Sequence, residues 1–200
     1  MSRRRDSYEQ KRGHGIFQSY GPHWDSDLVV DVKKINIILD TAGVHTGVRV
    51  LDVACGTGVL FPFYAERKAA FVTAVDISAE MAKIAASKAP GQIHVICDDI
   101  ETMHGTGDYD CCVVYNAFPH FPDPAGLIGH LAAWLKPGGR LTVAHSLNID
   151  RLDHHHAGNA SKVSRGMISA PELAALFGPW FYVDTAISDS EKYIVSGLLR

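Results

Sequence analysis

The sequence has no long apolar run and few cysteines. No stretch reaches the roughly 18 consecutive apolar residues of a membrane span, and the first fifteen residues are polar, so the sequence predicts neither a membrane helix nor a secretory signal. We therefore expect a cytoplasmic protein. The cysteines are Cys55, Cys97, Cys111 and Cys112, which form no C-x-x-C pair and are expected to be reduced, buried small residues.

The sequence also lacks a strong charge of either sign. Its formal net charge is -3 over 200 residues, with acidic and basic residues mixed along the chain, so we expect no nucleic-acid partner. The basic residues of positions 1–15 are interrupted by Asp6 and Glu9, and no aromatic pattern follows them. This segment is expected to be a flexible terminus. The chain contains no internal repeat and fits one globular domain.

An apolar run over residues 48–53 passes directly into a glycine-containing turn. A run without a polar face is typical of a parallel strand covered on both sides. Gly56 and Gly58 allow positive φ and the close approach of a ligand. A dinucleotide fingerprint needs a third glycine, where this sequence has Phe61. Asp52 would repel a pyrophosphate but pair with an amine, so we expect a ligand with a cationic amino group.

The same residues resemble the first motif of the class I S-adenosylmethionine-dependent methyltransferases, which typically reads (D/E)-x-G-x-G-x-G. Here the motif runs from Asp52 to Gly58, with Ala54 at the first glycine position. Four further segments resemble later motifs of this family in order and spacing, and they cover residues 74–78, 97–100, 109–116 and 135–141.

The resemblance implies a map of the cofactor site. Asp76 would hold both ribose hydroxyls, Ile77 would line the adenine, and a carboxylate of the third motif would meet the adenine amino group. The residues expected to bind S-adenosylmethionine are Tyr20, Trp24, Asp52, Ala54, Gly56, Gly58, Asp76, Ile77, Met81, Asp99, Ile100 and Asn116. Cys55, at the start of a helix, is expected to contact the cofactor through its backbone, with a nucleophilic thiolate as the alternative.

Short apolar strands alternate with helical patterns, which predicts an α/β fold with a doubly wound, Rossmann-like sheet. The resemblance implies seven strands, mostly parallel, with an antiparallel C-terminal hairpin strand. The expected strands cover residues 48–53, 71–75, 93–97, 111–115, 141–144, 181–187 and 193–198. The expected helices cover residues 31–42, 60–68, 78–89, 123–135 and 171–177.

Two segments are expected to cover the site of a single methyltransferase domain over residues 1–200. Phe17, Tyr20 and Trp24 recur at helical spacing, in a stretch that resembles the aromatic segment folded over the cofactor in many small-molecule methyltransferases. Residues 16–42 are therefore expected to form an N-terminal helical lid, which would bury its apolar face on closing. Residues 147–168 are at the usual position of a substrate-facing insertion.

Histidines are the candidates for a general base. Methyl transfer requires a nucleophile placed about 3 Å from the methyl group, and histidine has a suitable pKa to deprotonate it. His120 and His145 follow the fourth and fifth expected strands, and His156 is the nearest counterpart of a later histidine in related sequences. The alternatives are a structural role at the strand ends, or the orientation of a small polar or anionic acceptor. No carboxylate or cysteine has ligand spacing with them, so we expect no metal.

The leading interpretation is S-adenosylmethionine-dependent methyl transfer to an unidentified small-molecule acceptor. The alternative from another class is a non-catalytic S-adenosylmethionine-binding sensor or partner subunit. A nicotinamide-dependent reductase is a third hypothesis, and Asp52 and Phe61 disfavour it.

Overall fold

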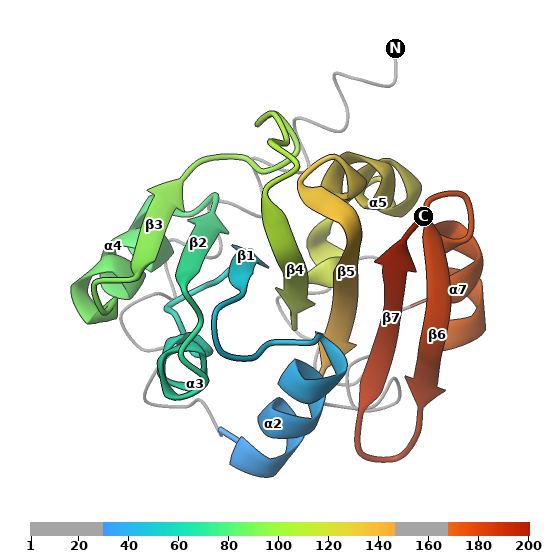
Figure 1. Ribbon diagram of the computed structural model, residues 1–200, viewed down its shortest axis with the longest axis horizontal. Coiled ribbons are helices and arrows are strands. Elements are labelled where there is room, and N and C mark those ends of the chain that lie inside the picture. The colour runs from blue at the N-terminus through green and yellow to red at the C-terminus, as the bar shows by residue number, and fades with distance from the viewer. Residues whose placement is uncertain (1–29, 147–167) are drawn as a thin grey trace.

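One seven-stranded sheet organises the residues that the computed structural model describes, which are 30–146 and 168–200. Its strand order is β3-β2-β1-β4-β5-β7-β6 (Figure 1). The first five strands pair in parallel, and β7 runs antiparallel to both β5 and β6. The predicted doubly wound α/β sheet with an antiparallel C-terminal hairpin is thereby confirmed. The strands are β1 (Arg49–Val53), β2 (Phe71–Asp76), β3 (Ile93–Cys97), β4 (Tyr109–Tyr115), β5 (Leu135–His145), β6 (Phe181–Ser188) and β7 (Tyr193–Leu199).

Helices cover both faces of the sheet because successive strand residues point to opposite sides. Val50 packs in a core cluster with α2, α3 and α4, whereas the next residue, Leu51, packs in a second cluster with α5 and α7. Figure 1 shows α7 against the hairpin and α4 beside β3 at the opposite edge. The helices are α2 (Val32–Thr41), α3 (Phe61–Glu66), α4 (Ala79–Lys88), the 3₁₀ helix η1 (Phe118–His120), α5 (Pro124–Ala132) and α7 (Ala170–Phe177). None of these described helices is long and apolar enough to cross a membrane.

The fifth strand begins earlier than expected. The sequence analysis expected this strand over residues 141–144, but β5 already starts at Leu135. Leu135 pairs with Tyr109, and the next partners are Arg140 and Cys111, so an irregularity separates the two pairs. Gly138 has a φ of 75°, which lets the extra residues bulge out while Leu135 stays buried. The other expected elements end within three residues of the observed ones.

The expectation of buried cysteines is wrong for one of the four. Cys55, Cys111 and Cys112 are buried, but Cys97 is exposed. Cys97 is the last residue of β3, which is an edge strand, so no neighbouring strand covers it on that side.

The loop between β3 and β4 lies tightly against the end of α5. The Gly107 amide donates to the carbonyl of Ala133 at 3.0 Å. A Cβ added to Gly105 would lie 2.5 Å from the Ala133 carbonyl oxygen. A side chain at position 105 would therefore push the loop away from α5 and disturb the start of β4.

We expect Gly105→Ala to lower the free energy of unfolding by about 1–3 kcal/mol, the usual cost of overpacking. Urea unfolding followed by circular dichroism measures it. Gly91→Ala is the matched control, because a Cβ at Gly91 meets nothing within 4 Å. Equal midpoints for the two variants would contradict the prediction.

Candidate active site

The turn after β1 uses three left-handed backbone positions. Ala54, Gly56 and Gly58 have φ values of 55°, 56° and 85°. A Cβ at Gly58 would lie 2.6 Å from the ring of Phe61, so glycine is needed there for packing. A Cβ at Gly56 would meet nothing within 4 Å, so the backbone of Gly56 borders open space. The turn therefore offers its main chain to a ligand at Gly56.

Asp76, the last residue of β2, ties this turn to the next helix. One carboxylate oxygen accepts the Gly56 amide at 2.8 Å, and the other accepts the Ser78 amide at 2.9 Å. The Ser78 side chain in turn caps α4 by accepting the Met81 amide. Each carboxylate oxygen has a further lone pair, so Asp76 can also accept hydrogen bonds from a diol. Ile77 is 37% exposed beside it and offers an apolar surface to a flat ring.

Asp52 is a buried carboxylate with an unsatisfied oxygen. Asp52 is only 2% exposed, and its Oδ2 has no hydrogen-bond partner among the described residues. Burial and, second, the charge of Asp76 raise the pKa of Asp52 to about 8, and the Tyr64 hydroxyl opposes this rise. A cationic group at this place would stabilise the ionised form and supply the missing partner. The residues present thus suit the amino group that the sequence predicted.

Of the remaining predicted cofactor residues, Asp99 and Ile100 follow β3, Met81 lies in α4, and Asn116 follows β4. Asp99 is half-buried and accepts the Glu101 amide at 3.0 Å. Met81 and Ile100 are buried, so their side chains pack in the protein interior beneath the predicted cofactor site. Tyr20 and Trp24 lie outside the described residues.

Cys55 does not have the properties of a nucleophile. Burial, followed by the charges of Asp52 and Asp76, raises the pKa of its thiol. The protonated thiol is therefore the stable form, and the thiolate alternative has no support in the structure.

The ends of β4 and β5 are joined by one side chain. Asn116 has a φ of 54°, and its amide oxygen accepts the Ser146 backbone N–H at 2.9 Å. Its amide nitrogen donates to the Ser146 hydroxyl at 3.2 Å. Lys34, in the first turn of α2, donates to the Ser146 carbonyl at 3.4 Å. The sequence analysis missed Lys34, although two lysines in the first turn of a helix are an unusual signal, since cations there oppose the helix dipole.

The candidate histidines lie at the same sheet edge in different surroundings. His120 is half-buried in η1. His145 is 1% exposed and packs edge-on against Tyr193, with ring centroids 5.9 Å apart. His156 lies outside the described residues. Within the described parts of the chain, no group of three or more His, Cys, Asp or Glu is placed to hold a metal ion.

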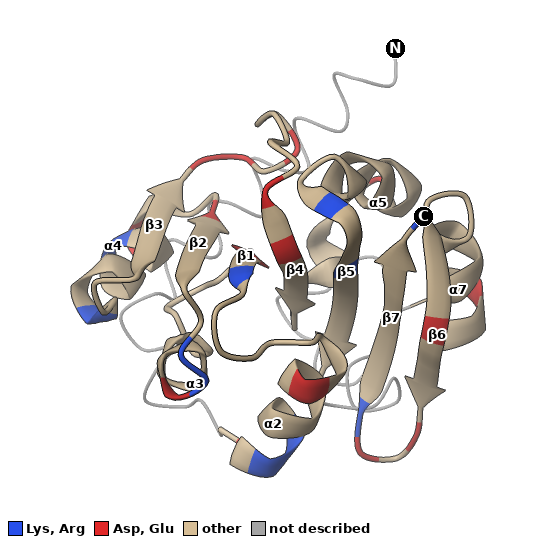
Figure 2. Ribbon diagram, in the orientation of Figure 1, with Lys and Arg blue, Asp and Glu red and all other residues tan. Residues whose placement is uncertain are grey.

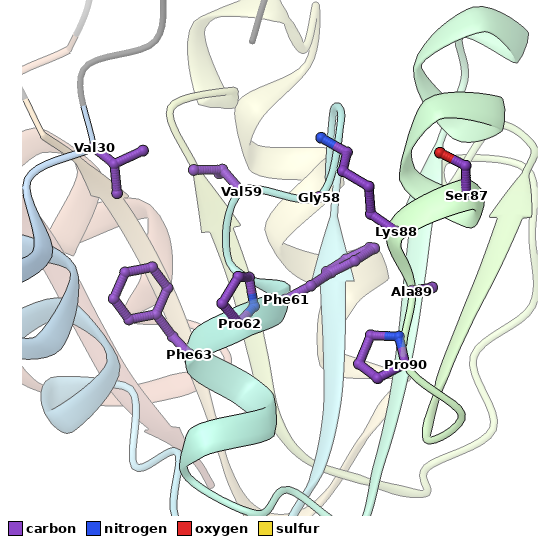
Figure 3. A pocket seen from close by; sticks show the side chains of 10 residues that line it. All are labelled: Val30, Gly58, Val59, Phe61, Pro62, Phe63, Ser87, Lys88, Ala89 and Pro90. Atoms are coloured by element: carbon purple, nitrogen blue, oxygen red, sulfur yellow. The ribbon is translucent and has the colours of Figure 1, made fainter.

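A cavity of about 650 Å³ lies between the start of α3 and the end of α4 (Figure 3). Its walls are mostly apolar, with Lys88 and Ser87 on the α4 side. Gly58 is the one predicted site residue in its wall, so the cavity adjoins the turn after β1 but is not lined by Asp52 or Asp76. The lining residues are Val30, Gly58, Val59, Phe61, Pro62, Phe63, Ser87, Lys88, Ala89 and Pro90.

The strand order, the glycine turn and the acidic residue at the end of β2 make up the α/β arrangement that the sequence analysis associated with methyltransferases. Comparisons with known proteins agree with this interpretation of the fold. Residues 50–139 match the methyltransferase domain family. Over 117 residues the chain is 37% identical to a ubiquinone biosynthesis O-methyltransferase of Xanthomonas oryzae pv. oryzae, a match that covers 56% of this chain and 47% of the relative. A protein of the same name from Xylella fastidiosa is 36% identical over 104 residues, covering 50% and 42%. The chain thus spans about half the length of the curated relatives it matches.

Solved structures share the fold at low sequence identity. An S-adenosylmethionine-dependent methyltransferase from Aquifex aeolicus has a TM-score of 0.69 at 18% identity, covering 83% of this chain and 89% of that one. The geranyl diphosphate C-methyltransferase of Streptomyces coelicolor has a TM-score of 0.67 at 14% identity, covering 84% and 78%. A [4+2]-cyclase has a TM-score of 0.63 at 20% identity, covering 76% and 58%. Residues 50–139 thus match a methyltransferase domain, and the chain shares its fold with S-adenosylmethionine-dependent methyltransferases.

Asp52 predicts a pH dependence of stability. Its pKa of about 8 in the folded protein exceeds the value of 3.8 for a free side chain. Between these pH values the folded state holds a proton that the unfolded state releases, so the stability of the ligand-free protein falls as pH rises. We expect Asp52→Asn to gain stability relative to wild type between pH 5 and pH 8, by more than about 1 kcal/mol. Urea unfolding at both pH values measures the gain.

Asp110→Asn is the control for this titration. Although partial burial raises it, the net pKa of Asp110 is lowered by bonds from Lys136 and from the Arg49 amide. The stability that ionised Asp110 contributes is therefore lost only in acid. Asp110→Asn should differ from wild type by the same free energy of unfolding at pH 5 and at pH 8. If Asp52→Asn also differs from wild type by the same free energy of unfolding at both pH values, Asp52 is not a buried carboxylate that titrates in this range.

Proposed function

We propose that this protein binds S-adenosylmethionine and that it methylates a hydroxyl oxygen of a small molecule. The observation that carries the proposal is the joint arrangement of the Gly56 turn, Asp76 and Asp52. It combines an open backbone position, a carboxylate held by two backbone amides and a buried carboxylate with one unsatisfied oxygen. An adenosine diol and a cationic amino group on one ligand would satisfy both carboxylates.

Bound S-adenosylmethionine supplies a methyl group made electrophilic by a positively charged sulfur. The chain's own residues fix where that group lies. Asp76 would accept the ribose hydroxyls while keeping its bonds to Gly56 and Ser78, so binding requires no rearrangement of the turn. Asp52 would lose its proton and hold the ligand's amino group in a site shielded from water.

The acceptor would bind at the ends of β4 and β5, beside Asn116 and Ser146. His120, which is half-buried beside this edge, is our candidate to take the hydroxyl proton. His145 is too buried to meet a substrate directly and would instead position the end of β5 through its contact with Tyr193. His156 remains a further candidate outside the described residues.

The choice of an oxygen acceptor rests on the relatives, which are O-methyltransferases by name. The fold does not decide it, because a C-methyltransferase and a cyclase share the fold. The competing function is that of a non-catalytic binding protein, which would have the same cofactor site but would not transfer the methyl group.

Calorimetric titration with S-adenosylhomocysteine tests the cofactor site. We expect one saturable site and no binding of nicotinamide dinucleotide. Asp76→Ala should weaken binding about 10- to 100-fold, since it removes charge-assisted hydrogen bonds. Asp110→Ala, at the opposite end of the sheet, is the control and should bind like wild type. Binding of the dinucleotide, or equal affinity in Asp76→Ala, would refute the proposal.

Transfer of labelled methyl groups to a small-molecule extract tests catalysis. We expect His120→Ala to lower the rate about 100-fold or more, the usual contribution of a general base, with unchanged S-adenosylhomocysteine affinity. His94→Ala is the control, because His94 lies near the start of β3 and stacks on Phe71. A full rate in His120→Ala would remove the proposed base. Binding without transfer to any small molecule would favour the non-catalytic function.

A further inference from the structure

Lys34 lies at the part of the site where the acceptor would bind. Its ammonium group is 3.4 Å from the carbonyl of Ser146, the residue that follows β5. Ser146 is held from the other side by Asn116, which follows β4. Asp52 and Asp76, the two carboxylates that suit the cofactor, lie instead at the ends of β1 and β2, and β4 separates β5 from β1 in the sheet. Lys34 therefore belongs to the acceptor half of the site.

The charge of Lys34 is poorly compensated. Its ion pair with Asp31 has an N–O distance of 3.7 Å, and Asp31 also caps the helix through the Lys34 amide. Other ion pairs of the described residues are much shorter, at 2.6–2.8 Å. These are Arg67–Asp40, Lys136–Asp110, Arg140–Asp184 and Lys192–Asp189.

The surrounding helix adds to this imbalance. The first turn of α2 contains Lys33 and Lys34 and no acidic residue, although the positive end of the helix dipole disfavours cations there. Figure 2 shows the basic colour at the amino end of α2 and the acidic colour at the end of β2. The side chain of Lys34 is 22% exposed, so it is partly buried and a ligand can still reach it. A residue kept at an electrostatic cost has an external partner as its simplest explanation.

We infer that the acceptor carries a carboxylate and that Lys34 binds it. The inference rests on the proposed function and names the substrate class of the same site. A single ammonium beside the neutral groups of Asn116 and Ser146 matches one negative charge better than the two of a phosphate. An anionic acceptor is also attracted by the positive sulfur of the cofactor, which favours its approach to the methyl group.

Matched ligands that differ in charge test this inference. We would titrate S-adenosylhomocysteine-saturated protein with hydroxybenzoate and with hydroxybenzamide, which have nearly the same shape. Wild type should bind the acid at least tenfold more tightly than the amide. Lys34→Met should lose this preference, whereas Lys34→Arg should retain it, because arginine keeps the charge. Lys33→Met is the control for the same helical turn and should behave like wild type.

The outcomes separate this inference from the proposed function. Equal binding of acid and amide by wild type, no binding of either, or a preference that persists in Lys34→Met would overturn the carboxylate inference alone. A loss of S-adenosylhomocysteine affinity in Lys34→Met would also overturn it, by assigning the lysine to the cofactor. Failure of wild type to bind S-adenosylhomocysteine would overturn the proposed function, and the inference with it.

Discussion

Two neighbouring carboxylates at the ends of β1 and β2 are the constraint on which the site depends. Asp52 and Asp76 are both buried, and the charge of Asp76 adds to the burial that raises the pKa of Asp52. Asp76 is stabilised by two backbone N–H donors from the Gly56 turn and from Ser78. Asp52 has no such donors at its Oδ2, so a cationic ligand would stabilise its charged form. The glycine turn has its shape because it supplies one of these donors.

The two halves of the site suit ligand groups of opposite charge. The half at β1 and β2 is acidic and suits a ligand with an amino group, whereas the half at β4 and β5 contains Lys34 beside neutral polar groups. A cofactor with a cationic centre and an acceptor with an anionic group would each meet the complementary half. Asn116 fixes the distance between β4 and β5, so the acceptor half is rigid where it adjoins the cofactor.

Local sequence patterns predicted the parts of this structure that local interactions determine. Apolar runs located the strands, and the glycines located the turn, because strand burial and positive φ leave direct traces in composition. The start of β5 was missed because Gly138 and Gly139 look like a loop, although Leu135 is buried before them. Lys34 was missed for a different reason. Its partner Ser146 is 112 residues away, and no periodic pattern records such a contact. The burial of His145 likewise depends on β7, which pairs with β5 from the far end of the chain.

The acidic half of the site is defined by the family motif, but the acceptor half is not. Structures with this fold include a C-methyltransferase and a cyclase, so strand order and the glycine turn leave the reaction open. The proposed acceptor half lies after β4 and β5, at Asn116, His120 and Ser146, and at the lysine that α2 brings to them. Because α2 reaches the end of β5 through Lys34, the segment that precedes the sheet takes part in choosing the acceptor. Specificity in this protein therefore depends on contacts between elements far apart in the sequence, whereas cofactor binding depends on neighbouring strand ends.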